Sequence, residues 1–189
     1  MYALEDIETV GVVGAGTMGA GIAQVAATAG YDVVMRDIEQ SFLDRGFDTI
    51  DDSLSRLVDR DALSADEAEA AKDRITGTTA LDDLAGCEIV VEAAPEEMEL
   101  KQSIFADLDE VLDEEALLGT NTSTLSITTI ASATERADSV IGLHFMNPVP
   151  IMDGVEVVTG ERTTEETTAI AHAFAEDLGK ETWESDDKP

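Results

Sequence analysis

The chain has 189 residues, of which 43% are hydrophobic, enough for one large domain or two small ones at roughly 100–200 residues each and too many for a disordered chain. Asp and Glu number 42 against 11 Lys and Arg, giving a formal net charge of −31, which argues against binding to nucleic acid or an anionic membrane, because phosphate contacts need basic side chains. The sequence shows no signal peptide and no run near the roughly 18 apolar residues of a membrane span, so we expect a soluble, cytoplasmic protein.

The negative charge is spread along the whole chain. A surface that binds cations or basic proteins usually concentrates its acids in one block or tail, whereas here acidic residues occur in almost every segment. In molar salt the Debye length shrinks to roughly 3 Å, so the mutual repulsion of the carboxylates is screened. We therefore expect a protein from a salt-adapted, halophilic cell.

The chain opens with a strand, a glycine-rich turn, a helix and a second strand. The first strand ends at Val13, and apolar residues then recur at helical spacing from Ile22 until Gly30, a typical helix end. The second strand is predicted at 32–37. These segments together have the size of a βαβ unit.

Helices and strands continue to alternate along the chain. An amphipathic helix is predicted over about 39–58, and Ser64 with Glu67 forms a capping-box pattern that begins a helix reaching about Arg74. Further strands are predicted at 88–92, 117–121, 140–144 and 155–159, and further helices at about 96–112, 127–133 and 164–178. This alternation favours an α/β fold with a Rossmann-like, doubly wound, mostly parallel sheet.

The glycine motif predicts a dinucleotide site. In Gly14-x-Gly16-x-x-Gly19 the glycines permit a tight turn, close backbone approach to a pyrophosphate and close packing of helix on strand. Asp37 follows Gly19 by 18 residues and can accept hydrogen bonds from a ribose 2′-hydroxyl. It would repel a 2′-phosphate, which favours NAD over NADP, although the adjacent Arg36 complicates this preference. The alternative is a glycine turn that binds no nucleotide.

Two further groups of polar residues follow predicted strands. His144 could take the proton of a hydroxyl group, and Glu156, an acid within a nearby apolar strand, could orient its other ring nitrogen. The alternatives are a hydrogen-bonded core histidine and an outward-facing strand carboxylate. Asn121 and Ser123 could bind a substrate oxygen or the nicotinamide ribose, or could simply form a turn. His172 is expected to be a solvated residue on a helix face.

Metal and disulfide chemistry are not expected. The single cysteine, Cys87, excludes an internal disulfide and a cysteine-rich metal site, and its apolar neighbours predict a small buried side chain. The two histidines lie far apart in the sequence, and the acidic residues have no metal-ligand spacing.

Several motifs resemble the N-terminal domain of the L-3-hydroxyacyl-CoA dehydrogenases, which include the 3-hydroxybutyryl-CoA dehydrogenases. The resemblance covers almost the whole chain. It implies oxidation of a 3-hydroxyacyl-CoA to the 3-oxoacyl-CoA with NAD, in fatty-acid β-oxidation or butanoate metabolism. The matching segments are GAGTMGAGIA at 14–23, VVEAA at 90–94, NTSTL at 121–125, GLHFMNPVP at 142–150 and VEV at 155–157.

The resemblance also implies roles for individual residues. His144 matches the general base and Glu156 its carboxylate partner, and Ser123 matches the serine that contacts the substrate oxygen. Asn147, in the same motif as the base, is implied to be a further catalytic residue. Ser53 and Arg60 fall where relatives place a serine and a basic residue for the coenzyme A phosphate. No metal is implied. The implied cofactor-binding residues are Gly14, Ala15, Gly16, Thr17, Met18, Gly19, Asp37, Glu92 and Ser123.

The resemblance predicts that residues 1–184 form the NAD-binding domain. Residues 185–189 would begin the segment that leads, in relatives, to a helical C-terminal domain, which supplies dimer contacts, part of the acyl pocket and a further active-site asparagine. We expect the 189 residues of this chain not to include that domain. The chain would then be the cofactor-binding and catalytic-base domain of the dehydrogenase. Two alternatives are a non-catalytic NAD-binding module that needs a partner or the missing domain, and a related 3-hydroxyacid or sugar-acid dehydrogenase.

Overall fold

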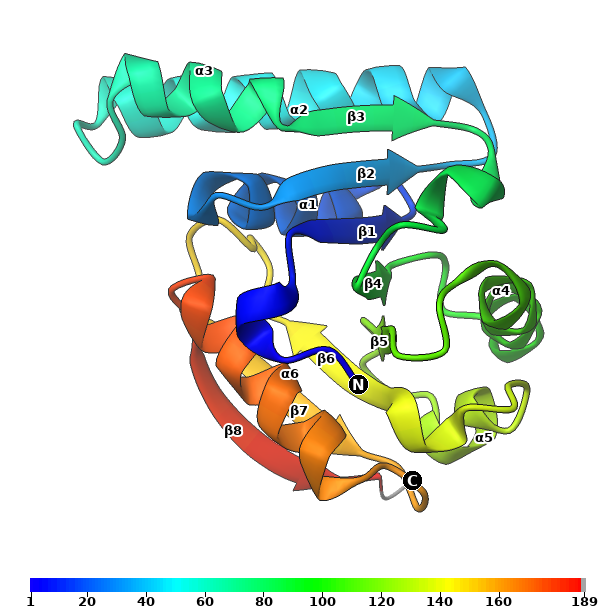
Figure 1. Ribbon diagram of the computed structural model, residues 1–189. Helices are drawn as coiled ribbons and strands as arrows, with labels where there is room; N and C mark the ends of the chain where they lie inside the picture. Colours follow the sequence, from blue (N-terminus) through cyan, green and yellow to red (C-terminus); the bar gives the residue numbers. More distant parts are fainter. Residues whose placement is uncertain (188–189) are drawn as a thin grey trace.

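The computed structural model describes residues 1–187, which form one eight-stranded sheet with helices on both faces (Figure 1). The strands are β1 (Thr9–Val13), β2 (Asp32–Arg36), β3 (Ile75–Thr78), β4 (Ile89–Glu92), β5 (Leu117–Thr120), β6 (Val140–Phe145), β7 (Gly154–Thr159) and β8 (Glu181–Asp186). The α-helices are α1 (Thr17–Ala29), α2 (Gln40–Asp59), α3 (Ala65–Asp73), α4 (Met98–Val111), α5 (Ile127–Ala131) and α6 (Glu165–Asp177). Three short 3-10 helices are η1 (Leu4–Asp6), η2 (Leu81–Leu84) and η3 (Ala137–Ser139).

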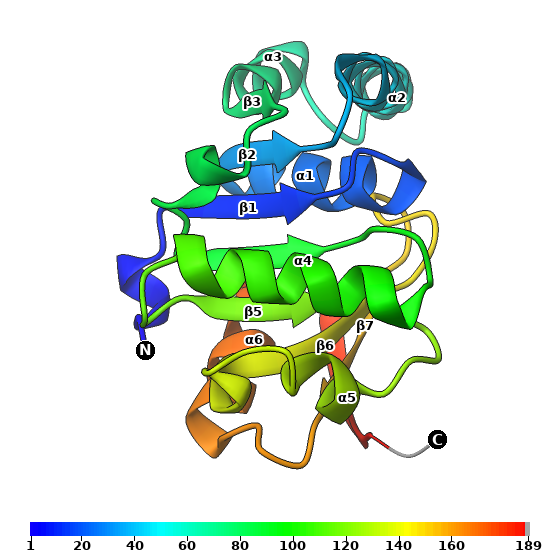
Figure 2. The same cartoon turned by 90° about the vertical axis from the view of Figure 1, so that its right-hand side faces the viewer.

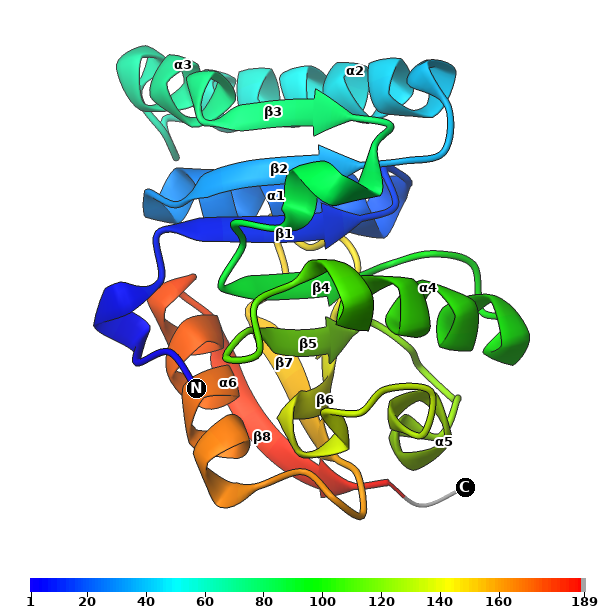
Figure 3. The ribbon, with the colours of Figure 1, turned by 45° about the vertical axis from the view of Figure 1, so that its right-hand side comes forward.

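The strands follow the spatial order β3-β2-β1-β4-β5-β6-β7-β8. The first six in this order are parallel to one another, β7 is antiparallel to β6, and β8 is parallel to β7. The arrowheads of β1, β2, β3, β4 and β5 accordingly point the same way in Figure 3. The predicted Rossmann-like, mostly parallel sheet is confirmed.

Two hydrophobic clusters fix the helices to opposite faces of the sheet. Side chains of α1, α2, α3 and α6, such as Ile22, Leu54 and Phe174, are buried in one cluster. Phe105 of α4 and Ile130 of α5 are buried in the other, and Figure 2 shows α4 crossing in front of β4 and β5. Among residues 1–187, no helix has the length and apolar character needed to cross a membrane.

The predicted helix ends are confirmed by their capping geometry. Gly30 ends α1 with φ of 111°, a left-handed conformation that costs glycine little. The capping box at the start of α3 is formed on both sides: Glu67 N donates to Ser64 Oγ at 3.2 Å, and Ser64 N donates to Glu67 Oε2 at 2.9 Å.

Two strands are absent from the sequence-based prediction. β3 is a short edge strand, and β8, the opposite edge, has the strongly polar sequence ETWESD without a hydrophobic run. The domain boundary predicted at 184 falls within β8, and the Asp187 carboxylate accepts a hydrogen bond from Thr128 N of α5 at 2.8 Å. The folded unit therefore continues through Asp187, while 188–189 of the predicted connecting segment lie outside the described residues.

Candidate active site and cofactor cleft

The ends of the parallel strands bring the predicted site residues to one edge of the sheet. Val13 is in register with both Arg36 and Glu92, and Glu92 is in register with Thr120. The segments that follow these strands therefore lie side by side. This is the edge where open α/β sheets bind their ligands.

The three glycines of the motif meet different constraints. Gly14 has φ of +102°, and a Cβ there would lie 2.8 Å from Ala93 O. A Cβ on Gly19 would lie 1.7 Å from Gly14 O, so α1 packs directly on the turn. A Cβ on Gly16 would meet no atom within 4 Å. Contacts within the chain thus explain why Gly14 and Gly19 leave no room for a side chain, whereas Gly16 borders open space.

A cavity of about 640 Å³ opens beside this turn. Asp37 lies in its wall, where Oδ2 accepts a hydrogen bond from Ala15 N at 2.7 Å and Oδ1 accepts one from Ile38 N at 2.7 Å. Arg45, whose guanidinium stacks 4.7 Å above the ring of Phe42, also lines the cavity. Of the predicted cofactor residues, the lining contains Gly14, Ala15, Gly16, Thr17, Met18 and Asp37.

The residues that line the cavity fit the phosphates of a dinucleotide in their chemistry. The space beside Gly16 would be filled by a Cβ, as expected where backbone must approach a phosphate closely. Gly16 is the N-cap of α1 and provides no capping side chain, which leaves the first turn of the helix open to an anion. The Nε atom of Arg36 is buried without a hydrogen-bond partner in the described part of the chain, and its residue lines the same cavity.

Glu92 does not face the cavity, which corrects its predicted contact with the cofactor. Its side chain is completely buried, as is that of Lys101, whose Nζ donates to Glu92 Oε1 at 2.6 Å. Ala94 N donates to the same oxygen at 2.6 Å, and Thr120 Oγ1 donates to Oε2 at 2.7 Å. Both carboxylate oxygens are thus occupied within the protein, and Glu92 supports the 93–95 wall of the cavity from beneath.

Glu96 joins this wall to the loop that carries Ser123, a link that sequence reasoning did not find. Its Oε1 accepts hydrogen bonds from Thr122 Oγ1 at 2.6 Å and from Ser123 N at 2.9 Å. Burial alone would raise the pKa of Glu96, but the hydrogen bonds from Thr122, Ser123 and Thr124 hold it below its ordinary value. The charged carboxylate therefore anchors the loop that presents Ser123.

Ser123, His144 and Glu156 form a continuous chain of contacts. Ser123 Oγ lies 3.1 Å from His144 Nε2, and His144 Nδ1 lies 3.1 Å from Glu156 Oε2. His144 and Glu156 are direct cross-strand neighbours in the antiparallel β6–β7 pair, so the fold itself makes them adjacent. The side chains of both are partly exposed, at 21% and 28%. Part of each side chain therefore remains accessible to solvent.

The Glu156 carboxylate has a further partner, Ser185 of β8. Ser185 Oγ donates to Glu156 Oε1 at 2.7 Å. This hydrogen bond and the one from His144 lower the pKa of Glu156 from its ordinary value against the opposing effect of burial. The sequence carries no signal for this contact, because Ser185 belongs to the strand that was not predicted.

The backbone around His144 is held from two sides. Phe145 N donates to Asn121 Oδ1 at 2.9 Å, so Asn121 joins the ends of β5 and β6. Near the end of the motif, the buried Lys180 Nζ donates to Val149 O at 2.7 Å and to Met152 O at 2.8 Å, and burial lowers the pKa of Lys180. Asn147, the other predicted catalytic residue, is exposed three positions beyond His144.

The remaining predictions fall away from this edge. Ser53 lies on α2, and Arg60, seven residues later, is the C-cap of this helix. At 1.5 Å per residue, Ser53 lies about 20 Å and Arg60 about 30 Å along the axis from the first residue of α2. Cys87 is buried, as predicted. His172 corrects its prediction: it is half-buried, and its Nδ1 lies 2.8 Å from Thr182 Oγ1 of β8. Within residues 1–187 no group of three or more His, Cys, Asp and Glu side chains could hold a metal ion.

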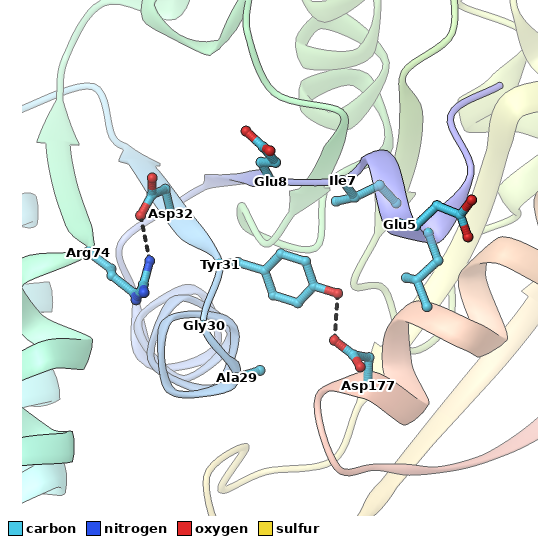
Figure 4. Close-up of a pocket in the computed structure, with 10 residues that line it drawn as sticks. Glu5, Ile7, Glu8, Ala29, Gly30, Tyr31, Asp32, Arg74 and Asp177 are labelled. Atoms are coloured by element: carbon cyan, nitrogen blue, oxygen red, sulfur yellow. Dashed lines mark hydrogen bonds and ion pairs between the residues drawn. The ribbon is translucent and has the colours of Figure 1, made fainter.

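A second cavity of about 580 Å³ lies at the opposite, amino edge of the sheet (Figure 4). Its polar groups already pair with one another: Tyr31 donates to Asp177 at 2.7 Å, and Arg74 contacts Asp32 at 3.0 Å. Burial and the contact with Asp177 raise the pKa of Tyr31. Because ligands of open α/β sheets bind at the carboxyl edge, the cavity beside Gly16 is the better candidate.

Comparison with known sequences agrees with this geometry. The sequence profile of a family described as "3-hydroxyacyl-CoA dehydrogenase, NAD binding domain" matches residues 9–187. The chain is 46% identical over 179 residues to a probable 3-hydroxybutyryl-CoA dehydrogenase of Deinococcus radiodurans, covering 95% of this chain and 64% of the relative. It is 44% identical over 183 residues to a 3-hydroxybutyryl-CoA dehydrogenase of Bradyrhizobium diazoefficiens, covering 97% of this chain and 62% of the relative.

The fold is also similar to solved structures. The crystal structure of (S)-3-hydroxybutyryl-CoA dehydrogenase from Ralstonia eutropha superposes with a TM-score of 0.95 at 43% sequence identity, covering 97% of this chain and 65% of that chain. The chain thus spans slightly less than two thirds of the length of these relatives.

Proposed function

Because the chain belongs to the family of NAD-binding domains of 3-hydroxyacyl-CoA dehydrogenases, we propose that it is the cofactor-binding and catalytic-base part of an enzyme that oxidises an L-3-hydroxyacyl-CoA to the 3-oxoacyl-CoA. The observation that carries the proposal is the chain of contacts from Ser123 through His144 to Glu156, on the same sheet edge as the cleft beside Gly16.

The proposed reaction assigns one task to each of these side chains. Ser123 holds the substrate oxygen, and His144 Nε2 takes the hydroxyl proton. Glu156, which accepts the hydrogen bond of Nδ1, keeps Nε2 free to act as a base and stabilises the imidazolium that forms. NAD, when bound, supplies the acceptor for the hydride that leaves the same carbon.

The cleft residues support NAD as the cofactor. The amides of the glycine turn and the start of α1 would hold the pyrophosphate, as backbone donors at a helix N-terminus do. Asp37 would accept hydrogen bonds from the adenosine ribose and disfavour a 2′-phosphate. Arg36 and Arg45, which line the cleft, would place positive charge beside the phosphates of a ligand on an otherwise acidic protein.

The proposed coenzyme A site lies on α2. Ser53 and Arg60 lie two helical turns apart, which places them on one side of the α2 axis. Arg60 is exposed and could meet a phosphate of coenzyme A. A substitution Arg60→Glu would test this assignment by weakening the binding of acetoacetyl-CoA without weakening that of NADH.

An assay of the chain itself tests the proposed reaction. The purified chain is mixed with NADH and acetoacetyl-CoA in molar KCl, and the absorbance of NADH is followed, with His144→Ala as the control. Loss of NADH with the parent chain and not with His144→Ala is the expected result. Equal loss with both proteins would reject His144 as the base, and free 3-hydroxybutyrate as a substrate with NAD would identify a hydroxyacid dehydrogenase instead.

A second candidate is an NAD-binding module that is not active alone. It is favoured by the 62–64% of the relatives' length that the chain covers, since the acyl pocket and dimer contacts would then lie in the remaining part. NADH binding by fluorescence without any turnover of acetoacetyl-CoA would support this candidate. The cytoplasmic location, expected because the sequence shows no signal peptide, and the salt adaptation, expected from composition, belong to the proposal in either form.

A further inference from the structure

Glu156 is held at both carboxylate oxygens, by groups from two different strands. His144 Nδ1 of β6 lies 3.1 Å from Oε2, and Ser185 Oγ of β8 donates to Oε1 at 2.7 Å. Both distances lie within or close to the usual range for such hydrogen bonds. The two strongest contacts therefore hold opposite oxygens of the carboxylate, and only one of them comes from the base itself, while the Trp183 side chain adds a smaller contribution.

The register of β7 and β8 puts Ser185 in this position. Glu156 is directly in register with Trp183, and Val158 with Ser185, so Ser185 is the diagonal neighbour of Glu156 on the same face of the sheet. The ring of Trp183 covers Gly154, where an added Cβ would lie 2.8 Å from the ring. β8 thus closes over the side of Glu156 that faces away from His144.

A second contact is needed because Glu156 is not packed in place. Its side chain is 28% exposed, and a glutamate has several rotatable bonds whose restriction costs free energy. Without Ser185, the carboxylate would keep His144 and the smaller contribution of the Trp183 side chain, and it could turn toward water. His144 would then lose the acceptor that decides which ring nitrogen carries the proton.

We propose that Ser185 is a positioning residue, which fixes the Glu156 carboxylate so that neutral His144 carries its proton on Nδ1 and leaves Nε2 free as the base. The inference rests on the proposed function for the role of the base, but the tautomer of His144 can be measured without turnover. The contact of Ser123 Oγ with Nε2 at 3.1 Å fits this tautomer, in which the serine hydroxyl donates to the ring. The lowered pKa of Glu156, of which the Ser185 hydrogen bond is the largest cause, keeps the carboxylate charged.

The test is the ¹⁵N chemical shifts of the histidine ring in the full chain at a pH well above the ordinary histidine range. The chain contains only two histidines, so His172→Gln assigns both ring systems. The matched variants are Ser185→Thr and Ser185→Val, which have nearly the same shape and differ by the hydroxyl. Glu156→Gln shows the spectrum without the carboxylate, and the amide spectrum of each variant reports whether it is folded.

We expect the parent chain and Ser185→Thr to show mainly the Nδ1–H form. In Ser185→Val the tautomer equilibrium should move about tenfold toward the Nε2–H form, because one hydrogen bond to a charged group is lost. The shifts of His172 should not change. Ser185→Ala provides the same comparison with a smaller side chain if Ser185→Val perturbs the amide spectrum of β8.

Two outcomes would overturn the inference: an unchanged His144 tautomer in folded Ser185→Val and Ser185→Ala, or equal changes in Ser185→Thr and Ser185→Val. Failure of the proposed function would look different. If the expected tautomer changes occur while neither the parent chain nor its assembly with a C-terminal part turns over acetoacetyl-CoA, Ser185 still positions Glu156 and the proposed reaction is wrong.

Discussion

The interaction between His144 and Glu156 depends on charge as well as on shape. A Glu156→Gln substitution keeps the size of the side chain but removes the negative charge, and its amide NH₂ can donate to Nδ1 and so favour the wrong tautomer. We expect kcat to fall on the order of 10³-fold while NADH affinity is retained, as for other bases that lose their orienting carboxylate. Turnover of acetoacetyl-CoA, measured beside an NADH fluorescence titration, checks this in a form of the protein that is active. A loss of NADH binding equal to the loss of turnover would contradict it.

The pair formed by Glu92 and Lys101 has a structural role, and removing one partner should be costly. Both side chains are completely buried, so Lys101→Met would leave the Glu92 carboxylate without its counter-charge. We expect the free energy of unfolding to fall by about 3–5 kcal/mol, measured by urea denaturation. The double variant Glu92→Gln with Lys101→Met should recover part of this loss. A single variant as stable as the parent would show that the pair does not support the fold.

At the scale of elements, two glycines at the start of α1 allow packing and ligand binding to be tested separately. Gly16→Ala adds a methyl group where no protein atom lies within 4 Å, whereas Gly19→Ala adds one 1.7 Å from Gly14 O. We expect Gly16→Ala to change the free energy of unfolding by less than about 1 kcal/mol, since its main cost is a poorer helix cap, but to weaken NADH binding at least about tenfold.

Gly19→Ala is the matched control, and it should lower the melting temperature because α1 must move away from the turn. Thermal unfolding and NADH titration of both variants make the comparison. Unchanged NADH affinity in folded Gly16→Ala would mean that the open space beside Gly16 is not where the dinucleotide binds.

The sequence was sufficient to predict elements that carry a strong local signal. It was not sufficient to predict elements that form only through their contacts with distant parts of the chain. α3 could be predicted because Ser64 and Glu67 form their capping box within one helical turn. β8 could not, because ETWESD lacks a hydrophobic run and becomes a strand only through its pairing with β7. Strand propensity is in general a statement about packing against neighbours.

The same distinction applies to the site. His144 and Glu156 could be paired from the order of the predicted strands, and the register places them opposite each other. The burial of Glu92 could not be predicted, because it depends on Lys101 of α4 folding back beneath the end of β4. Ser185 and Glu96 were missed for the same reason, since their partners lie 29 and 27 residues away in the chain.

For the whole molecule, the net charge of −31 predicts how stability responds to salt. Salt weakens attraction and repulsion between exposed charges alike. Exposed ion pairs, such as Lys72–Asp51 and Arg56–Asp52, lose little when screened because each contributes little. Repulsion among an excess of carboxylates is spread over the whole surface and favours the expanded chain. Screening should therefore stabilise the fold, and we expect the melting temperature to rise as KCl increases from dilute buffer to molar concentration.

The choice of salt and a charge variant make this prediction specific. Chloride is used because sulfate stabilises folded proteins generally by exclusion from their surface. A variant with Asp48→Asn, Asp59→Asn, Glu69→Gln and Glu110→Gln, all at exposed helical positions, should melt at a higher temperature than the parent in dilute buffer and gain less from KCl. A melting temperature that stays constant or falls with KCl would mean that attractive pairs balance or outweigh the repulsion, and adaptation to salt would then no longer explain the composition.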